Sequence, residues 1–227
     1  DARAEDLNAA FAAHPQTAFY LYYIEKDTDL NFETGEKSGL YDYLTGLLTL
    51  PDDHMACFRV DSFEAFCQNF YRTDHHWNNR GSYLGYTQVM ALLGRTDVLE
   101  PIEEVDLGYT FSGSKAISAG ATNVFTEPFT AYQFDFAPET ITVNGKPAAD
   151  YGAQAAYFAH QPETISYGMF YGGDEGEVIF DTGPTGRGSL LVLGESYDNA
   201  ILKLLSESFD KTYSVDLRYY EAKMGQS

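Results

Sequence analysis

The stretch YRTDHHWNNRGSYLGY places an aspartate, two histidines and the only tryptophan of the chain side by side at positions 74–77. The chain has five histidines in all, so two adjacent ones beside an aspartate stand out from its composition. An aspartate two residues from a histidine, as Asp74 is from His76, can orient that ring as a general base if the chain turns between them. The same groups can bind a divalent metal ion, so the stretch alone leaves both chemistries open.

A serine that needs such a base follows the apolar run SLLVL, which predicts a buried strand over Ser189–Leu193. Gly194-Glu195-Ser196 comes next, and a helical pattern extends from about Asp198 to Ser206. At such a junction the helix amino terminus presents unpaired N–H groups beyond the end of the strand. Ser196 is therefore either a nucleophile or only a helix cap.

Asp74, His76 and Ser196 together supply the acid, the base and the nucleophile of a triad, and a triad requires neither a metal nor another cofactor. The backbone N–H groups of Ser196 and Tyr197 can stabilise the oxyanion. His75 and Trp77 are then interpreted as supports of the loop, with Trp77 as a second choice for stacking on a sugar.

Alternating strand and helix patterns must position these groups. Helices are predicted over 4–12, 40–48 and 83–93, the last capped by Asn78 or Asn79, and strands over 18–24, 55–60, 166–171, 178–180 and 213–217. Such alternation predicts an α/β fold with a mostly parallel sheet covered on both faces. The opening DARAEDLNAAFAA reads as part of a helix, so we expect the sequence to begin inside a longer protein.

The segment from Asp106 to Ala159 has a different character, rich in glycine, serine, threonine and aromatic residues. Residues 140–143 alternate, and Asn144-Gly145 is a hairpin turn signal. We interpret 106–159 as an antiparallel or irregular β-rich insertion that builds a cleft wall within a single domain of residues 1–227.

Thirty-four acidic and fourteen basic residues give a formal charge of −20, which repels nucleic acid and anionic membrane surfaces. Eighteen tyrosines and sixteen phenylalanines exceed what a core of this size needs, so some are expected to line a surface or cleft. No apolar stretch is long enough to span a membrane, and no secretion signal is present in the sequence. Cys57 and Cys67 are either a disulfide or two thiols.

The order YRTDHHW, LGES and SVDLRYY resembles the bacterial family named for its DHHW motif. That family is similar to the SGNH (GDSL-like) hydrolases and to the alginate-type polysaccharide O-acetyltransferases. The resemblance covers about Tyr71 to Tyr220. It implies a flavodoxin-like three-layer α/β/α fold, an exported or cell-surface protein, and a triad of Ser196, His76 and Asp74 that acts on an acetylated carbohydrate or a small acyl ester.

The resemblance also implies roles around the triad. Tyr171 and Arg218 are expected to bind substrate. Asp174 stands where related proteins often have an asparagine of the oxyanion hole, and a carboxylate there repels developing negative charge. Either Asp174 is turned away, or the hole is built from backbone; the expected oxyanion residues are Ser196, Gly172, Gly173 and Asp174. Glu195 replaces the aspartate of the GDS block.

Two other functions compete with this hypothesis. A metal-dependent phosphoesterase would combine Asp27 and Asp29 with the aspartate and histidines at 74–76 on two hard metal ions. A catalytically weak carbohydrate-binding or surface protein would keep the fold but not the rate, as Asp174 would favour.

Overall fold

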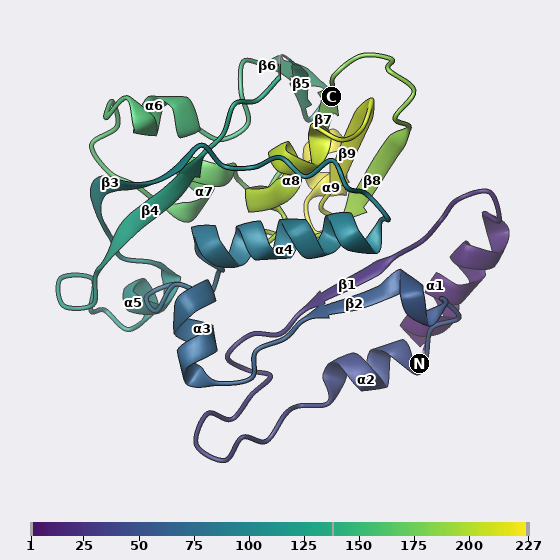
Figure 1. Ribbon diagram of the computed structural model, residues 1–227, viewed down its shortest axis with the longest axis horizontal. Coiled ribbons are helices and arrows are strands. Elements are labelled where there is room, and N and C mark those ends of the chain that lie inside the picture. The colour runs from purple at the N-terminus through teal and green to yellow at the C-terminus, as the bar shows by residue number, and fades with distance from the viewer. Residues whose placement is uncertain (1, 138, 226–227) are drawn as a thin grey trace. The chain divides into compact units, whose positions relative to one another are not determined.

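A computed structural model describes residues 2–137 and 139–225, which form two compact units (Figure 1). The first unit comprises Asp1–Gln68 and Thr87–Thr96, and the second comprises Asn69–Tyr86 and Asp97–Ser227. The residues of the expected triad all belong to the second unit. Among the described residues, no helix combines the length and the apolar character that a membrane crossing requires.

The first unit contains a two-stranded parallel sheet in which Leu21 pairs with Met55 and Ile24 pairs with Phe58. The elements up to the boundary of the unit are α1 (Ala2–Ala13), β1 (Leu21–Ile24), α2 (Leu40–Thr45), the 3-10 turn η1 (Asp52–His54), β2 (Met55–Phe58) and α3 (Phe63–Asn69). The two predicted strands are confirmed in shorter form. Both cysteines are free thiols in this structure.

Helix α4 (Asn79–Leu92) follows the DHHW stretch directly. The side-chain oxygen of Asn78 accepts hydrogen bonds from the N–H groups of Arg80 at 3.0 Å and Gly81 at 3.1 Å. These bonds satisfy N–H groups that the first helical turn cannot pair internally. The predicted cap is confirmed, and it fixes where the DHHW stretch ends.

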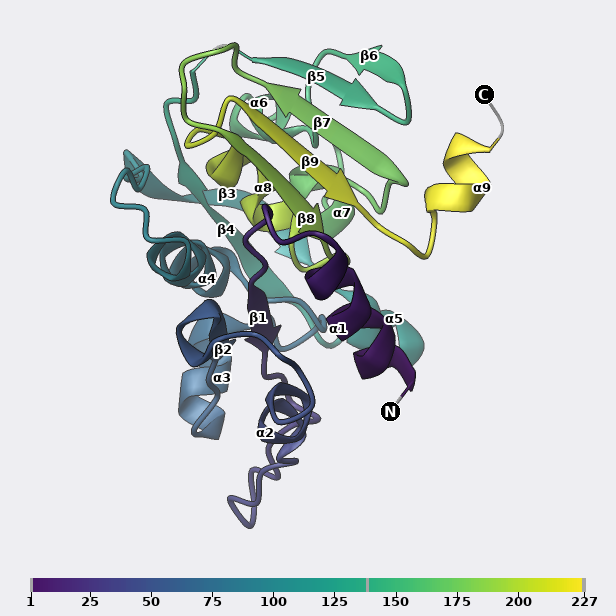
Figure 2. The same ribbon diagram turned by 90° about the vertical axis from the view of Figure 1, so that its right-hand side faces the viewer.

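The second unit contains a five-stranded sheet in the order β6-β5-β7-β9-β8 and a separate antiparallel pair, β3-β4 (Figure 2). Its further elements are β3 (Glu103–Phe111), α5 (Ser114–Ser118), β4 (Glu127–Gln133), β5 (Thr140–Val143), β6 (Lys146–Ala148), α6 (Gln154–Phe158), α7 (Tyr167–Tyr171), β7 (Glu177–Asp181), β8 (Ser189–Leu193), α8 (Asn199–Ser206), β9 (Lys211–Val215) and α9 (Tyr220–Met224). Leu202 of α8 packs on the sheet in a buried cluster with Ile141, Val178 and Phe180.

The predicted flavodoxin-like fold with a mostly parallel sheet is wrong. Among the strands of the described residues, only β1-β2 and β8-β9 are parallel pairs, whereas β5-β6, β5-β7, β7-β9 and β3-β4 are antiparallel. The parallel strands β8 and β9 are joined through helix α8, as a parallel connection requires. The hairpin β5-β6 joins the same sheet through β7 and makes that side antiparallel.

Two local predictions had opposite outcomes. The turn at Asn144-Gly145 is confirmed, since both residues have positive φ, 48° and 75°, and connect β5 to β6. The strand predicted over 166–171 is wrong, because the segment forms helix α7. The Ser166 side chain caps that helix by accepting from the N–H of Met169, and positions 167, 170 and 171 are buried at helical spacing. The single domain over 1–227 stays a prediction.

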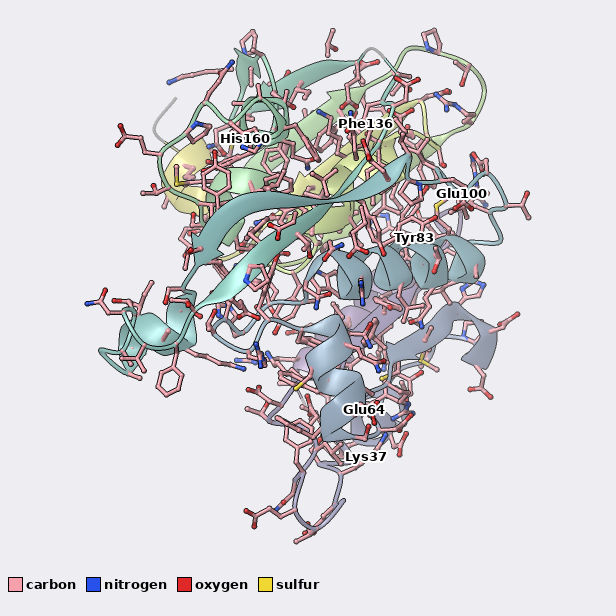
Figure 3. The ribbon with its side chains drawn as sticks, turned by 60° about the vertical axis from the view of Figure 1, so that its left-hand side comes forward. Lys37, Glu64, Tyr83, Glu100, Phe136 and His160 are labelled. Atoms are coloured by element: carbon pink, nitrogen blue, oxygen red, sulfur yellow. The ribbon has the colours of Figure 1, made fainter. Side chains whose placement is uncertain are left out.

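Part of the aromatic surplus forms a row of half-buried rings on the second unit. Tyr83 and Tyr132 have ring centroids 5.5 Å apart, and Phe134 and Phe136 have centroids 5.7 Å apart. Figure 3 labels two of these residues, Tyr83 and Phe136. Lys203 lies over the ring of Phe136, 4.8 Å from its centroid. None of these residues lines the pocket of Ser196 described below.

Candidate active site

The loop that carries Asp74 and His76 is closed by its own backbone. The N–H of Tyr71 donates to the carbonyl of His76 at 3.1 Å, and the N–H of Asn78 donates to the carbonyl of Asn69 at 2.9 Å. Within this loop Asp74 Oδ1 accepts from the N–H of His76 at 3.0 Å and lies 2.5 Å from His76 Nδ1. One carboxylate oxygen therefore fixes both the backbone and the ring of the histidine.

Ser196 lies in the turn between β8 and α8, and its Oγ is 2.8 Å from His76 Nε2 across 120 residues of sequence. When Nδ1 carries the ring proton, it donates to Asp74, and Nε2 is free to accept the proton of the serine hydroxyl. The alternative interpretation of Ser196 as a helix cap is wrong, because Asp198 stands at the N-cap position of α8 and the serine hydroxyl pairs with His76. The three residues are thus connected as an acid, a base and a nucleophile.

Asp74 is buried and well supplied with donors. Its Oδ2 accepts from the N–H of Ser114 at 2.6 Å, in addition to the bonds from His76. Burial alone raises the pKa of this carboxyl, but hydrogen bonds from the His76 ring and from both N–H groups outweigh it and hold the pKa well below its usual range. Asp74 therefore stays ionised and can stabilise an imidazolium.

Gly113 allows the close approach of the α5 segment to Asp74. A Cβ atom at position 113 would lie 2.2 Å from Asp74 Cβ and 2.4 Å from its Oδ2, distances at which atoms cannot coexist. The absence of a side chain there lets the N–H of Ser114 reach the carboxylate. Neither Gly113 nor Ser114 was predicted from the sequence, which carries no local signal that this loop meets the triad.

A pocket with a volume of ≈ 420 Å³ opens at Ser196. It is lined by His75, His76, Tyr167, Gly168, Gly172, Gly173, Asp174, Ser196, Asn199 and Arg218. Of the residues expected to bind substrate, Arg218 is in this wall. The expectation that Trp77 and Tyr171 bind substrate is corrected: both are buried, with 0% and 6% of their surface exposed, and neither lines the pocket.

Trp77 instead contributes to the floor of the site through Tyr167. The indole N–H of Trp77 donates to the hydroxyl oxygen of Tyr167 at 3.2 Å, and the Tyr167 ring stacks against His76. This supports the interpretation of Trp77 as a structural residue. The sequence does not predict this role for Tyr167, because the pattern over 166–171 favours a strand.

Two residues that line the pocket carry a backbone N–H group without an acceptor in the described part of the chain. Among residues 2–137 and 139–225, the N–H groups of Ser196 and Gly173 have no hydrogen-bond partner. The N–H of Gly172 is different, because it donates to the carbonyl of Gly168 at 3.0 Å and closes helix α7. Gly172 therefore presents its carbonyl, which accepts from Asn199 Nδ2 at 3.2 Å, and is not available as the oxyanion donor expected from the sequence.

The carboxylate of Asp174 is held by partners at both oxygens. Oδ1 accepts from Asn199 Nδ2 at 3.3 Å, and Oδ2 lies 3.4 Å from Arg218. Arg218 also pairs with Glu195 at 3.6 Å and with Asp216 at 2.5 Å. Asn199 was missed, although its place on the first turn of the helix after Ser196 was a signal that it could reach the same pocket.

Asp198 adds an ionisable group beneath this wall. Burial, together with the nearby charges of Asp216, Asp174 and Glu195, raises the pKa of Asp198 to about 8. Its Oδ2 is buried and has no hydrogen-bond partner within the described part of the chain. The carboxyl is therefore largely protonated at neutral pH, which limits the negative charge around Arg218.

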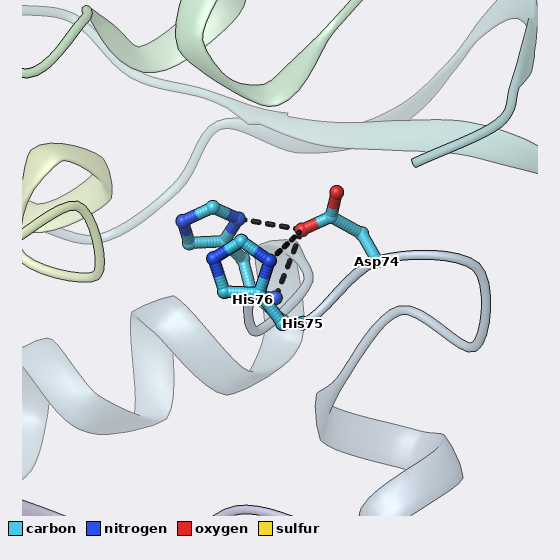
Figure 4. A group of neighbouring side chains, drawn as sticks. All are labelled: Asp74, His75 and His76. Atoms are coloured by element: carbon cyan, nitrogen blue, oxygen red, sulfur yellow. Dashed lines mark hydrogen bonds and ion pairs between the residues drawn. The ribbon is translucent and has the colours of Figure 1, made fainter. Parts of the chain in front are cut away.

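A metal ion could also be held by Asp74, His75 and His76, whose oxygen and nitrogen atoms lie within 4.8 Å of one another (Figure 4). In this structure those atoms bond to each other and to Ser114. Asp29, which the phosphoesterase hypothesis would recruit, belongs to the first unit and accepts from Tyr23 at 3.1 Å and Ser38 at 2.8 Å.

Comparison with known proteins shows likeness to one protein family and to solved structures. A sequence profile of the DHHW protein family matches residues 55–215. A DHHW family protein from Eubacterium siraeum superposes with a TM-score of 0.66 at 19% identity, covering 96% of this chain and 75% of that one. Two structures of Bacillus cereus PatB1, the first described with a sulfonyl adduct, superpose with TM-scores of 0.63 and 0.61. Identities are 23% and 21%, with 96% and 94% of this chain and 78% and 79% of PatB1 covered. None of the curated proteins matches.

Proposed function

The chain belongs to the DHHW protein family, and we propose that it is a serine-dependent acyl-ester hydrolase or O-acetyltransferase that acts on acetylated carbohydrate at the cell surface. The observation that carries the proposal is the connection from Ser196 Oγ to His76 Nε2 at 2.8 Å and from His76 Nδ1 to Asp74 at 2.5 Å. The carbohydrate substrate and the export of the protein rest on resemblance to the SGNH hydrolases and alginate-type acetyltransferases. The sulfonyl adduct of PatB1 fits with a reactive nucleophile in a protein of this fold.

In the first half-reaction Ser196 Oγ attacks the acyl carbonyl while His76 Nε2 takes the hydroxyl proton. The carbonyl oxygen becomes an oxyanion, for which the N–H groups of Ser196 and Gly173 are available donors. Ionised Asp74 stabilises the imidazolium. The adduct then breaks the bond to the alcohol oxygen, which leaves with the proton from His76, and the acyl group stays on Ser196.

In the second half-reaction a hydroxyl group replaces the departed alcohol. His76 takes its proton as its oxygen attacks the acyl-enzyme, and then returns the proton to Ser196 when the acyl–serine bond breaks. Water as the acceptor gives hydrolysis, and a sugar hydroxyl gives transfer. The open pocket admits either acceptor.

Release of acetate from p-nitrophenyl acetate and from an acetylated oligosaccharide tests the proposal. We expect Ser196→Ala to abolish both activities, and Ser189→Ala, an exposed serine on the same strand, to keep them. Mass spectrometry of an added sugar acceptor distinguishes transfer from hydrolysis. Equal rates for the wild type and Ser196→Ala would favour the competing function, a carbohydrate-binding protein without catalysis, which the carboxylate of Asp174 at the pocket favours.

A further inference from the structure

His75 is placed at the pocket but has no part in the mechanism above. It lines the same wall as His76, yet 47% of its side-chain surface is exposed, against 9% for His76. A substrate in the pocket can therefore touch the His75 ring directly. The ring lies beside that of His76, with centroids 3.9 Å apart and planes inclined by 37°.

The position of His75 is fixed from both ends. Its Nδ1 lies 2.6 Å from Ser114 Oγ and 3.6 Å from Asp74 Oδ1. Its carbonyl accepts a hydrogen bond from the hydroxyl of Tyr197, the residue that follows Ser196. An imidazole held in this way is preorganised for binding and loses little freedom when a ligand arrives.

Both imidazole rings present their second nitrogen in the same direction. Figure 4 shows each ring with one nitrogen toward Asp74 and the other on the opposite side. For His76 that other nitrogen, Nε2, meets Ser196. Since the two rings lie side by side, Nε2 of His75 is directed to the same side as Nε2 of His76, where the alcohol oxygen of an ester must exchange its proton.

Adjacent hydroxyl groups on a sugar ring match this pair of nitrogens. We propose that His75 Nε2 binds the hydroxyl group next to the one that exchanges its proton with His76, so that His75 selects 1,2-diols over simple alcohols as leaving groups and acceptors. A hydroxyl can donate or accept, so it suits either tautomer of His75. The inference rests on the proposed function and narrows its substrate to esters with a neighbouring hydroxyl.

Two small esters isolate this contact. The cis and trans monoacetates of cyclohexane-1,2-diol carry the neighbouring hydroxyl, and cyclohexyl acetate lacks it. We expect the wild type to prefer the better monoacetate by about 5- to 10-fold in kcat/KM, the value of one neutral hydrogen bond. His75→Leu should bring the preference close to unity. His75→Gln, which keeps a donor at a similar reach, should retain part of it.

The preference is a ratio measured on active enzyme, so general damage by the substitution cancels. Ser189→Ala is the matched control and should keep the wild-type ratio. A wild type without preference, or a His75→Leu variant that keeps it, would overturn the role of His75. Turnover of no ester by the wild type, or equal turnover by Ser196→Ala, would instead overturn the proposed function and this inference with it.

Discussion

The imidazole ring of His76 lies flat on the phenol ring of Tyr167, with centroids 3.8 Å apart and planes 6° from parallel. Tyr167 is itself anchored, since its hydroxyl accepts from the indole of Trp77 and donates to the carbonyl of Tyr197 at 3.3 Å. Because Tyr197 follows Ser196, one buried network positions both the base and the turn of the nucleophile.

The ring of Tyr167, more than its hydroxyl, should support catalysis. Tyr167→Leu removes the flat surface beneath His76 and should lower kcat by about 10- to 100-fold, as small displacements of a catalytic group do. Tyr167→Phe keeps that surface but removes the hydroxyl that accepts from the Trp77 N–H, so it should cost about 0.5–1.5 kcal/mol of unfolding free energy and lower kcat less than Tyr167→Leu does. Steady-state kinetics and urea denaturation check this. An equal loss of kcat in both variants would show that the hydroxyl matters instead.

Asp74 should be required for rate across the pH range. Because its hydrogen bonds hold its pKa well below the usual range, Asp74 stays ionised in mild acid and should add no acidic step of its own to the pH–rate profile. Asp74→Asn should lower kcat by about 10²- to 10⁴-fold. The pH–rate profile of the wild type checks the first statement, and a second acidic step attributable to Asp74 would contradict it.

Asp198 should make the fold less stable as pH rises. Its pKa is raised to about 8, so between the unfolded value near 4 and about 8 the folded state binds more protons than the unfolded state. Its contribution is thus fully present below the unfolded pKa and is lost as pH rises through 8. Asp198→Asn should flatten this slope, with a larger gain in Tm at pH 9 than at pH 5. A gain that is the same at both pH values would contradict the buried, protonated state.

Loss of Arg218 should lower kcat more than loss of the Asp174 carboxylate does. Arg218→Gln leaves Asp174, Glu195 and Asp216 unbalanced beside the oxyanion, at a cost of roughly 1 kcal/mol or more, or about tenfold in kcat. Asp174→Asn in that background should recover part of the loss. Kinetics of the two single variants and the double variant measure this coupling. Strictly additive effects would show that Arg218 does not act by neutralising Asp174.

Site residues could be predicted from the sequence where the type of side chain alone indicates a chemical role. Asp74, His76 and Ser196 are three complementary groups, and the strand before the serine was read from a continuous apolar run. Tyr167 was not predictable in this way, because nothing in the sequence indicates which of the eighteen tyrosines stacks on His76. The orientation of Trp77 also depends on packing with a partner 90 residues away.

The fold shows the same division between local and distant causes. The strand over Ser189–Leu193, the cap at Asn78 and the turn at Asn144-Gly145 follow from neighbouring residues, and all three are confirmed. Strand direction does not, because it depends on which strands pair. Pairing of β5 with β7 and of β7 with β9 made the sheet largely antiparallel, which an alternation of elements could not reveal.

Chemical trapping of Ser196 tests the central claim most directly. After incubation with phenylmethylsulfonyl fluoride, intact mass and peptide mapping should show one sulfonyl group on Ser196 in the wild type and none on Ser196→Ala. In His76→Gln the rate of labelling should fall by a factor of about 100 or more, since the base that activates the serine is gone. Labelling at Ser196 that is absent in the wild type, or that is as fast in His76→Gln, would contradict a serine activated by His76 and Asp74.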